Sequence, residues 1–181
     1  MTRALVVFES LFGDGRTIAH AVAQGLSAHM PVDVVAAAEA PSVVDAEVRL
    51  LVVGGPNHAF SMPRPSTREG AIKQYGAQIA DTSRGLHEWL EAVQVSHGGT
   101  AAAAFDTRSE HPKLLVKMDH AAKTEEKVLR GHGCSIVAPA EHFYVKDVKG
   151  PLADGEEDRA RSWGSHLADL LAPRTTDTAS G

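Results

Sequence analysis

Five short apolar stretches recur along the chain, and segments with helical periodicity lie between most of them. The stretches are Leu5–Phe8, Val32–Ala37, Val48–Val53, Thr100–Phe105 and Cys134–Ala138. Uninterrupted apolar runs of this length are typical of parallel strands that are buried on both faces. His142–Val145 has the same character and predicts either a short extra strand or a continuation of the fifth.

Apolar residues recur at three- and four-residue spacing after these runs, which predicts amphipathic helices. The helices are expected from Thr17, from Thr82 or Ser83, over Lys113–Arg130 and over Asp154–Leu171. Residues 54–81 are rich in Gly, Pro, Ser and Arg and are expected to form a long loop. Strands that alternate with helices in this way predict a doubly wound α/β sandwich around a parallel sheet.

Length and composition narrow the class of protein. The 181 residues suit one folded domain, expected over 1–172, and the polar residues 173–181 are expected to be a disordered tail. A net charge of −5 argues against nucleic-acid binding. No apolar stretch is long enough for a membrane span, and residues 1–20 lack a secretory signal. A single cysteine, Cys134, is compatible with the reducing cytoplasm, where we expect the protein to act.

Three polar loops follow the first, third and fourth predicted strands, at residues 9–16, 54–70 and 106–112. The first loop carries Gly13 and Gly15 and leads directly into a helix. The first amides of a helix have no partner within the helix and lie at the positive end of its dipole. We therefore expect this loop to attract a phosphate group.

The loop sequences resemble those of flavodoxin-like proteins. F-E-S-L-F-G-D-G-R-T-I-A (8–19) resembles the phosphate loop of that family. V-V-G-G-P-N-H-A-F-S-M-P-R-P-S-T-R-E-G-A (52–71), A-A-F-D-T-R (103–108) and G-P-L-A-D-G-E-E-D-R-A-R-S-W-G (150–164) are similar to an actinobacterial branch of it. The resemblance covers residues 3–172 and implies a five-stranded parallel sheet of order 2-1-3-4-5, with helices on both faces.

The resemblance further implies that the protein binds FMN at the ends of these strands. It places the phosphate on the first loop and the flavin ring between the second and third loops. The implied residues are Ser10, Phe12, Gly13, Asp14, Gly15, Arg16 and Thr17, then Pro56, Asn57, His58, Ala59 and Phe60, and Asp106, Thr107 and Arg108. The implied function is electron transfer, or a small oxidoreductase activity on a quinone-like acceptor, with an unidentified redox partner.

Two positions depart from the family's phosphate loop. Asp14 stands where the family has Asn, and Gly15 stands where it has Thr. A carboxylate repels the phosphate, and a donor hydroxyl is lost, so we expect FMN to bind more weakly than in typical members. The same two residues favour an alternative, in which the fold is a flavin-free binding or interaction module that holds another anion in the same crevice.

Several side chains in the ring-side loops allow two interpretations. Phe60 either covers one face of the ring or holds its loop onto the body, and His58 either donates a hydrogen bond or is exposed. Arg64, Arg68 and Arg108 would either bind an anionic substrate or stabilise an anionic reduced flavin. We expect Arg68 instead to pair with Glu110 in a solvated loop, and Arg108 to act on the ring.

Other chemistries lack their motifs. A dinucleotide fingerprint requires a third small residue three positions after Gly15, and Ile18 stands there. The G-K-[ST] of a nucleotide-triphosphate loop is absent. G-x-S-x-G is also absent. A phosphorylated receiver domain requires paired acidic residues after the first strand, where only Glu9 stands. The ten histidines show no metal-binding spacing, and Cys134 and Phe105 are expected in the core.

Overall fold

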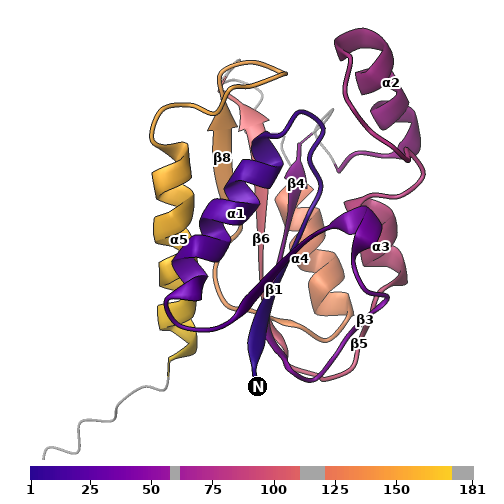
Figure 1. Ribbon diagram of the computed structural model, residues 1–181. Helices are drawn as coiled ribbons and strands as arrows, with labels where there is room; N and C mark the ends of the chain where they lie inside the picture. Colours follow the sequence, from indigo (N-terminus) through magenta and orange to yellow (C-terminus); the bar gives the residue numbers. More distant parts are fainter. Residues whose placement is uncertain (58–61, 111–120, 173–181) are drawn as a thin grey trace, which may run out of the picture.

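A computed structural model describes residues 1–57, 62–110 and 121–172 of the chain. Strands run through the centre and helices cover both faces of the sheet (Figure 1). The strands point their carboxyl ends toward the top of Figure 1, where the loops discussed below converge. The expected tail at residues 173–181 lies outside the described residues.

The main sheet is parallel throughout its described strands, in the order β2-β1-β4-β6, with β7 and β8 both pairing with β6. Its strands are β1 (Arg3–Phe8), β2 (Val32–Ala36), β4 (Val48–Pro56), β6 (Ala101–Ser109), β7 (Ser135–Ile136) and β8 (Glu141–Val145). Because β7 and β8 are consecutive parts of one edge, the predicted order 2-1-3-4-5 is confirmed. The stretch at 142–145 is therefore a continuation of the fifth strand.

A second, two-stranded parallel sheet was not predicted. It joins β3 (Val43–Val44) to β5 (Gln94–Val95). β3 comes shortly after the short 3-10 helix η1 (Ala37–Glu39) in the chain. Both strands are two residues long, so neither produces a recognisable apolar run. The pairing ties the connection after β2 to the segment that follows the helix α3 (Leu86–Ala92).

Two strands run further than the apolar pattern indicates, so the predicted loops at 54–70 and 106–112 begin too early. β4 continues to Pro56 and β6 to Ser109, and the two remain paired from Gly54↔Phe105 to Pro56↔Thr107. On its other side β6 pairs with β8, from Phe105↔Glu141 to Ser109↔Val145. Neighbours on both sides satisfy the backbone of this segment, so its polar residues remain in the strand.

The sheet lies between two layers of helices. α1 (Asp14–Ser27) and α5 (Glu156–Leu171) cover one face, and α3 (Leu86–Ala92) and α4 (Ala121–Gly131) cover the other (Figure 1). Strand side chains alternate accordingly: Val6 contacts the α1/α5 layer, and Val7 contacts the α3/α4 layer. Phe105 is buried, as predicted, and stacks edge to face on Phe143 and Trp163.

Helix starts differ from the predicted ones, and one helix was not predicted. α1 begins at Asp14 rather than Thr17, α3 at Leu86 rather than at a Thr82 or Ser83 cap, and α5 at Glu156 rather than Asp154. The unpredicted helix is α2 (Pro65–Tyr75), which lies inside the segment expected to be a loop. The part of the predicted fourth helix at 113–120 lies outside the described residues.

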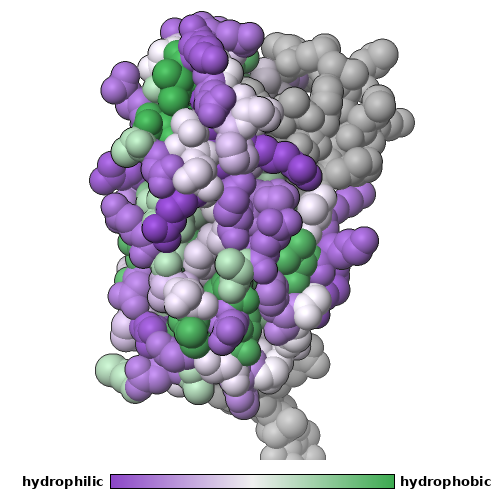
Figure 2. Space-filling view, turned by 90° about the vertical axis from the view of Figure 1, so that its right-hand side faces the viewer, coloured by the Kyte–Doolittle hydropathy of each residue, from purple (hydrophilic) through white to green (hydrophobic). Residues whose placement is uncertain are grey.

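Helix α2 stands apart from the two helical layers (Figure 1). Its buried side chains are Arg68 and Ala71, and the rest of the helix is mostly polar. The face of the molecule that carries α2 and α3 is largely hydrophilic, with small separate groups of apolar side chains (Figure 2). No helix in the described ranges is both long and apolar enough to cross a membrane.

Glycines bring α1 and α5 into backbone contact. A Cβ atom at Gly25 of α1 would collide with the Arg161 carbonyl, and one at Gly164 of α5 would collide with the Val22 carbonyl. A backbone atom cannot rotate aside as a side chain can. These two positions therefore require glycine for reasons of space, and they fix the distance between the helices.

We predict that Gly164→Ala destabilises the fold by about 1–3 kcal/mol, because the added methyl forces α1 and α5 apart. Gly70→Ala is the matched control, since Gly70 is also helical but has open space around its Cα. There the substitution should be neutral or stabilise by up to about 1 kcal/mol. Urea unfolding of both variants measures the difference, and equal effects would contradict the argument.

Candidate functional site

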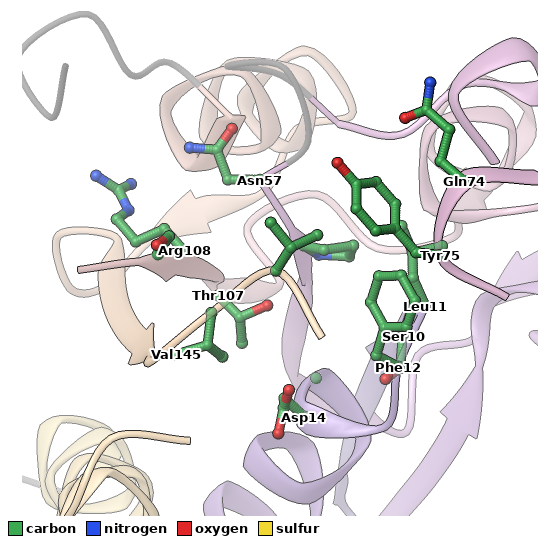
Figure 3. A pocket seen from close by; sticks show the side chains of 14 residues that line it. Ser10, Leu11, Phe12, Asp14, Asn57, Gln74, Tyr75, Thr107, Arg108 and Val145 are labelled. Carbon is green, nitrogen blue, oxygen red and sulfur yellow. The ribbon is translucent and has the colours of Figure 1, made fainter. Parts of the chain in front are cut away.

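A pocket of about 260 Å³ opens at the carboxyl ends of the strands. The loop after β1, the end of β4, the end of β6 and the segment after β8 all contribute to its wall (Figure 3). The lining residues are Ser10, Leu11, Phe12, Asp14, Gly15, Pro56, Asn57, Gln74, Tyr75, Thr107, Arg108, Ser109, Val145 and Val148. The three loops singled out in the sequence thus contribute to one crevice, as the strand order requires.

The loop after β1 uses its hydroxyl groups internally. Gly13 has a φ of 103°, in the left-handed region that favours glycine, and its backbone N–H donates to Ser10 Oγ at 3.0 Å. The Thr17 hydroxyl donates to the Gly13 carbonyl at 3.2 Å. The N–H groups of Asp14, Gly15 and Arg16 find no acceptor among the described residues. These amides are available to an anion.

Gly15 is required by space. A Cβ atom there would lie 2.7 Å from the Glu9 carbonyl oxygen, because the first turn of α1 presses against the end of β1. The sequence suggested that this position had merely lost a threonine hydroxyl. In this chain a threonine at position 15 would displace the helix, so the glycine is part of the loop's construction.

The Asp14 carboxylate lies beside the segment that follows β8. It approaches Gly150 so closely that a Cβ there would collide with it, and it accepts a hydrogen bond from the Leu152 backbone. Burial raises the pKa of Asp14 above its ordinary value, and the Leu152 amide partly opposes the rise. The carboxylate therefore fastens the 150–152 segment to the start of α1, in addition to lining the pocket.

Asn57 directly follows β4, lines the pocket and carries an unused acceptor. Its backbone N–H donates to the Thr107 carbonyl at 2.8 Å, which holds the two ring-side strands together. Its side-chain Oδ1 is buried and has no hydrogen-bond partner among the described residues. A buried acceptor without a donor is costly, so the position favours a ligand that brings an N–H or O–H group. Figure 3 shows Asn57 at the rim opposite Asp14.

Arg108 is ion-paired inside the end of the sheet. Its Nε and Nη2 donate to the two carboxylate oxygens of Asp106 at 2.8 and 2.6 Å, and both residues are buried. His142 of β8 lies against the pair, with Nδ1 3.1 Å from Asp106 Oδ2. Arg108 was expected in a loop, where it would act on the ring. It lies instead in β6, and its guanidinium is paired with Asp106. His142 was missed because nothing in the sequence marks its proximity to Asp106.

Arg68 is buried with only 1% of its side chain exposed, and the expected pairing with Glu110 is wrong. Its Nε donates to Glu9 at 2.6 Å, and its Nη2 lies 2.8 Å from Glu88. Further donors reach the carbonyls of Pro63 and Thr82. Glu9 also accepts from the Leu86 amide at 2.8 Å, at the start of α3. Arg68 therefore has a structural position behind the loop, and not one beside the pocket.

Aromatic side chains line the pocket on the α2 side. Phe12 and Tyr75 meet edge to face, with ring centroids 6.3 Å apart (Figure 3). Tyr75 was missed because α2 was not predicted, although Pro65 at its start and Gly76 after its end are typical helix boundaries. Arg64 precedes α2 at its cap position. The predicted contacts of His58, Ala59 and Phe60 lie outside the described residues.

Within residues 1–57, 62–110 and 121–172, no group of three or more potential metal-binding side chains is gathered in one place. Cys134 is buried and reduced, and burial raises the pKa of its thiol. A thiol held protonated is a poor nucleophile. Cys134 does not line the pocket, whose wall offers the free amides of the α1 start and several hydroxyl groups.

We predict that Arg68→Met destabilises the protein by about 3–5 kcal/mol, because Glu9 then remains buried without its cation. Lys73→Met, an exposed position on the same helix, is the control and should change stability by less than about 0.5 kcal/mol. Chemical denaturation measures both. A loss below about 1 kcal/mol for Arg68→Met would mean that Glu9 is satisfied without Arg68.

Glu125 of α4 generates a pH-dependent prediction. Its side chain is buried, and neither carboxyl oxygen has a hydrogen-bond partner in the part of the chain that the structure describes. Burial, followed by the negative charges of Asp106, Glu9 and Glu126, raises its pKa well above the ordinary 4.5. The folded state retains a proton that the unfolded state releases near pH 4.5. This contribution to stability is therefore complete below that pH and is lost as the pH rises toward the folded-state pKa.

Glu125→Gln removes the titrating group, so the variant should gain stability relative to the parent as the pH rises above about 4.5. Glu69→Gln, at an exposed site on α2, is the control and should change stability by less than about 0.5 kcal/mol. Denaturation at a series of pH values distinguishes them. A constant difference for Glu125→Gln would show that Glu125 has the same pKa in both states.

Comparison with known proteins supports the fold. No family profile matches the sequence, and no curated protein matches it. Solved structures do match: a flavodoxin from the domain Archaea has a TM-score of 0.64 at 16% identity, over 94% of this chain and 100% of that one. Flavodoxin 1 from Bacillus cereus has a TM-score of 0.65 at 12% identity, with the same coverage.

A flavodoxin, WrbA-like protein from Agrobacterium tumefaciens has a TM-score of 0.56 at 12% identity, over 94% of this chain and 97% of that one. Structural similarity at such low sequence identity establishes the fold of the chain and does not establish its chemistry. The chain has the α/β fold of the flavodoxins, a parallel sheet flanked by helices.

Proposed function

We propose that the protein binds FMN in the crevice at the ends of β1, β4 and β6 and acts in electron transfer. One observation carries the proposal: the crevice offers free backbone donors at one end and the unsatisfied Asn57 acceptor at the other. A phosphate fits the first, and a ring with an N–H group fits the second. FMN carries both groups, and the flavodoxin fold supports this choice.

The phosphate would lie over the amides of Asp14, Gly15 and Arg16, where the α1 dipole favours negative charge. Ser10 and Thr17 contribute by holding the loop around Gly13, since their hydroxyls are already engaged there. Asp14 opposes the phosphate by its charge.

The ring would lie toward Asn57, Thr107 and Arg108. Asn57 Oδ1 would accept from a ring N–H, and the hydrogen bond from the Asn57 amide to the Thr107 carbonyl would hold the residue in position. FMN supplies reversible one- and two-electron transfer when bound. The ion pair with Asp106 reduces the effect of Arg108 on the ring, so the strongly positive ring environment expected from the sequence is not supported.

The finer assignment is also a proposal. The loop sequences support a place in an actinobacterial branch of the flavodoxin-like proteins, and the lone buried Cys134 is compatible with a cytoplasmic location. An acceptor protein or a small quinone-like molecule would receive the electrons. The flavin-free alternative rested on Asp14 and Gly15, and the steric requirement at Gly15 removes half of that argument.

The test is a titration of the purified, FMN-free protein with FMN, followed by flavin fluorescence and the visible spectrum. One equivalent of FMN should bind, and its absorption bands should shift as the ring leaves water. A protein that is purified without flavin and takes up none when it is added would contradict the proposal and favour the flavin-free module.

Asp14→Asn should tighten FMN binding about fivefold or more. The substitution removes a negative charge whose repulsion of the phosphate costs roughly 1 kcal/mol or more. Asparagine keeps an acceptor oxygen for the Leu152 amide, so the loop should hold its shape. Asp169→Asn, an exposed position on α5, changes the net charge equally and is the control. Unchanged or weaker binding by Asp14→Asn would place the phosphate away from the start of α1.

A further inference from the structure

A second, larger hollow lies on the other side of the loop after β1. Its volume is about 880 Å³, which is in the range of sites for small organic ligands. Ser10, Leu11, Phe12 and Tyr75 line both this hollow and the pocket described above. They form a partition between the two, and Figure 3 shows Leu11, Phe12 and Tyr75 together along one side of the first pocket.

Three basic side chains line the second hollow. Arg16 and His20 are one helical turn apart on α1, and Lys149 comes from the segment after β8. In the described part of the chain none of the three has an acidic ion-pair partner. In a chain of net charge −5, three basic residues around one hollow favour an anion locally.

The rest of the wall is suited to a flat apolar body. Phe8, Leu11 and Phe12 contribute apolar surface from the first strand and its loop, and Val34 and Ala36 contribute it from the edge strand β2. The His20 ring is tilted against the Phe8 ring, with centroids 6.3 Å apart. Glu39, the one acidic residue of the lining, comes from η1 after β2. The lining therefore combines aromatic surface with basic groups and a single carboxylate.

We propose that this hollow is a second ligand site, separate from the FMN crevice, and that it takes a small flat apolar molecule carrying one anionic group. The anionic group would lie among Arg16, His20 and Lys149, and the apolar body would lie on Phe12 and the β2 side chains. This inference does not rest on FMN binding, since it uses the opposite side of the partition. A site there would place a second small molecule beside the proposed cofactor.

The test uses 2-naphthalenesulfonate as the probe, titrated into the protein by calorimetry both without FMN and with saturating FMN. We expect saturable binding of one equivalent in both cases, with a dissociation constant of about 1 mM or lower. The uncharged 2-naphthol should bind several-fold more weakly, because it lacks the anionic group.

Lys149→Ala should weaken the probe about threefold or more and leave FMN affinity unchanged. Lys146→Ala is the matched control: it removes the same charge three residues away, where Lys146 pairs with Asp154 outside the hollow. It should leave probe binding unchanged. Lys149→Glu should weaken the probe further than Lys149→Ala.

Three results would overturn the inference: no saturable binding of the probe, displacement of the probe by FMN, or equal weakening by Lys149→Ala and Lys146→Ala. Displacement would mean that the hollow belongs to the cofactor site. If the probe binds as expected while FMN does not bind, the second site stands and the proposed FMN function fails.

Discussion

The loop after β1 depends on a buried carboxylate, Glu9, at the end of that strand. Glu9 receives hydrogen bonds from Arg68 and from the Leu86 amide, and so joins β1 to both α2 and α3. A buried ion pair of this kind adds little net stability compared with apolar residues, but the loss of one partner is costly. Here the ion pair holds the end of β1 in place. Ser10, the next residue, begins the candidate phosphate loop, so the first residue of that loop is also held in place.

The same end of the sheet contains more acid than base in its interior. Glu9 is paired with Arg68, and Asp106 is paired with Arg108, whereas Glu125 has no hydrogen-bond partner in the described residues. Burial raises the pKa of Glu125, and the negative charges of Asp106, Glu9 and Glu126 raise it further. The pocket thus lies above a layer in which both buried arginines are paired with carboxylates. Free positive charge is found instead on its far side, at Arg16 and Lys149.

The parts of the fold that could be predicted are those with a local signal. Runs such as Val48–Val53 identify strands by themselves, and their spacing fixes a parallel sheet. The end of β6 could not be predicted, because Asp106 and Arg108 are satisfied by each other and by His142, 34 residues beyond Arg108. Arg68 poses the same problem, since its partner Glu9 lies 59 residues away. In the site, Gly15 was noticed as a departure, but its cause, the Glu9 carbonyl, is visible only in three dimensions.

Helix α2 is attached to the body through few contacts, and this has a consequence for the motions of the molecule. It buries Arg68 and Ala71, so its detachment exposes little apolar surface and requires mainly the opening of one polar cluster. Segments of this kind exchange their amide hydrogens through local opening, well before the central strands unfold. Tyr75 is the last residue of α2 and belongs to the partition between the two hollows. Each such opening would withdraw Tyr75 and leave Ser10, Leu11 and Phe12 alone to separate the two hollows.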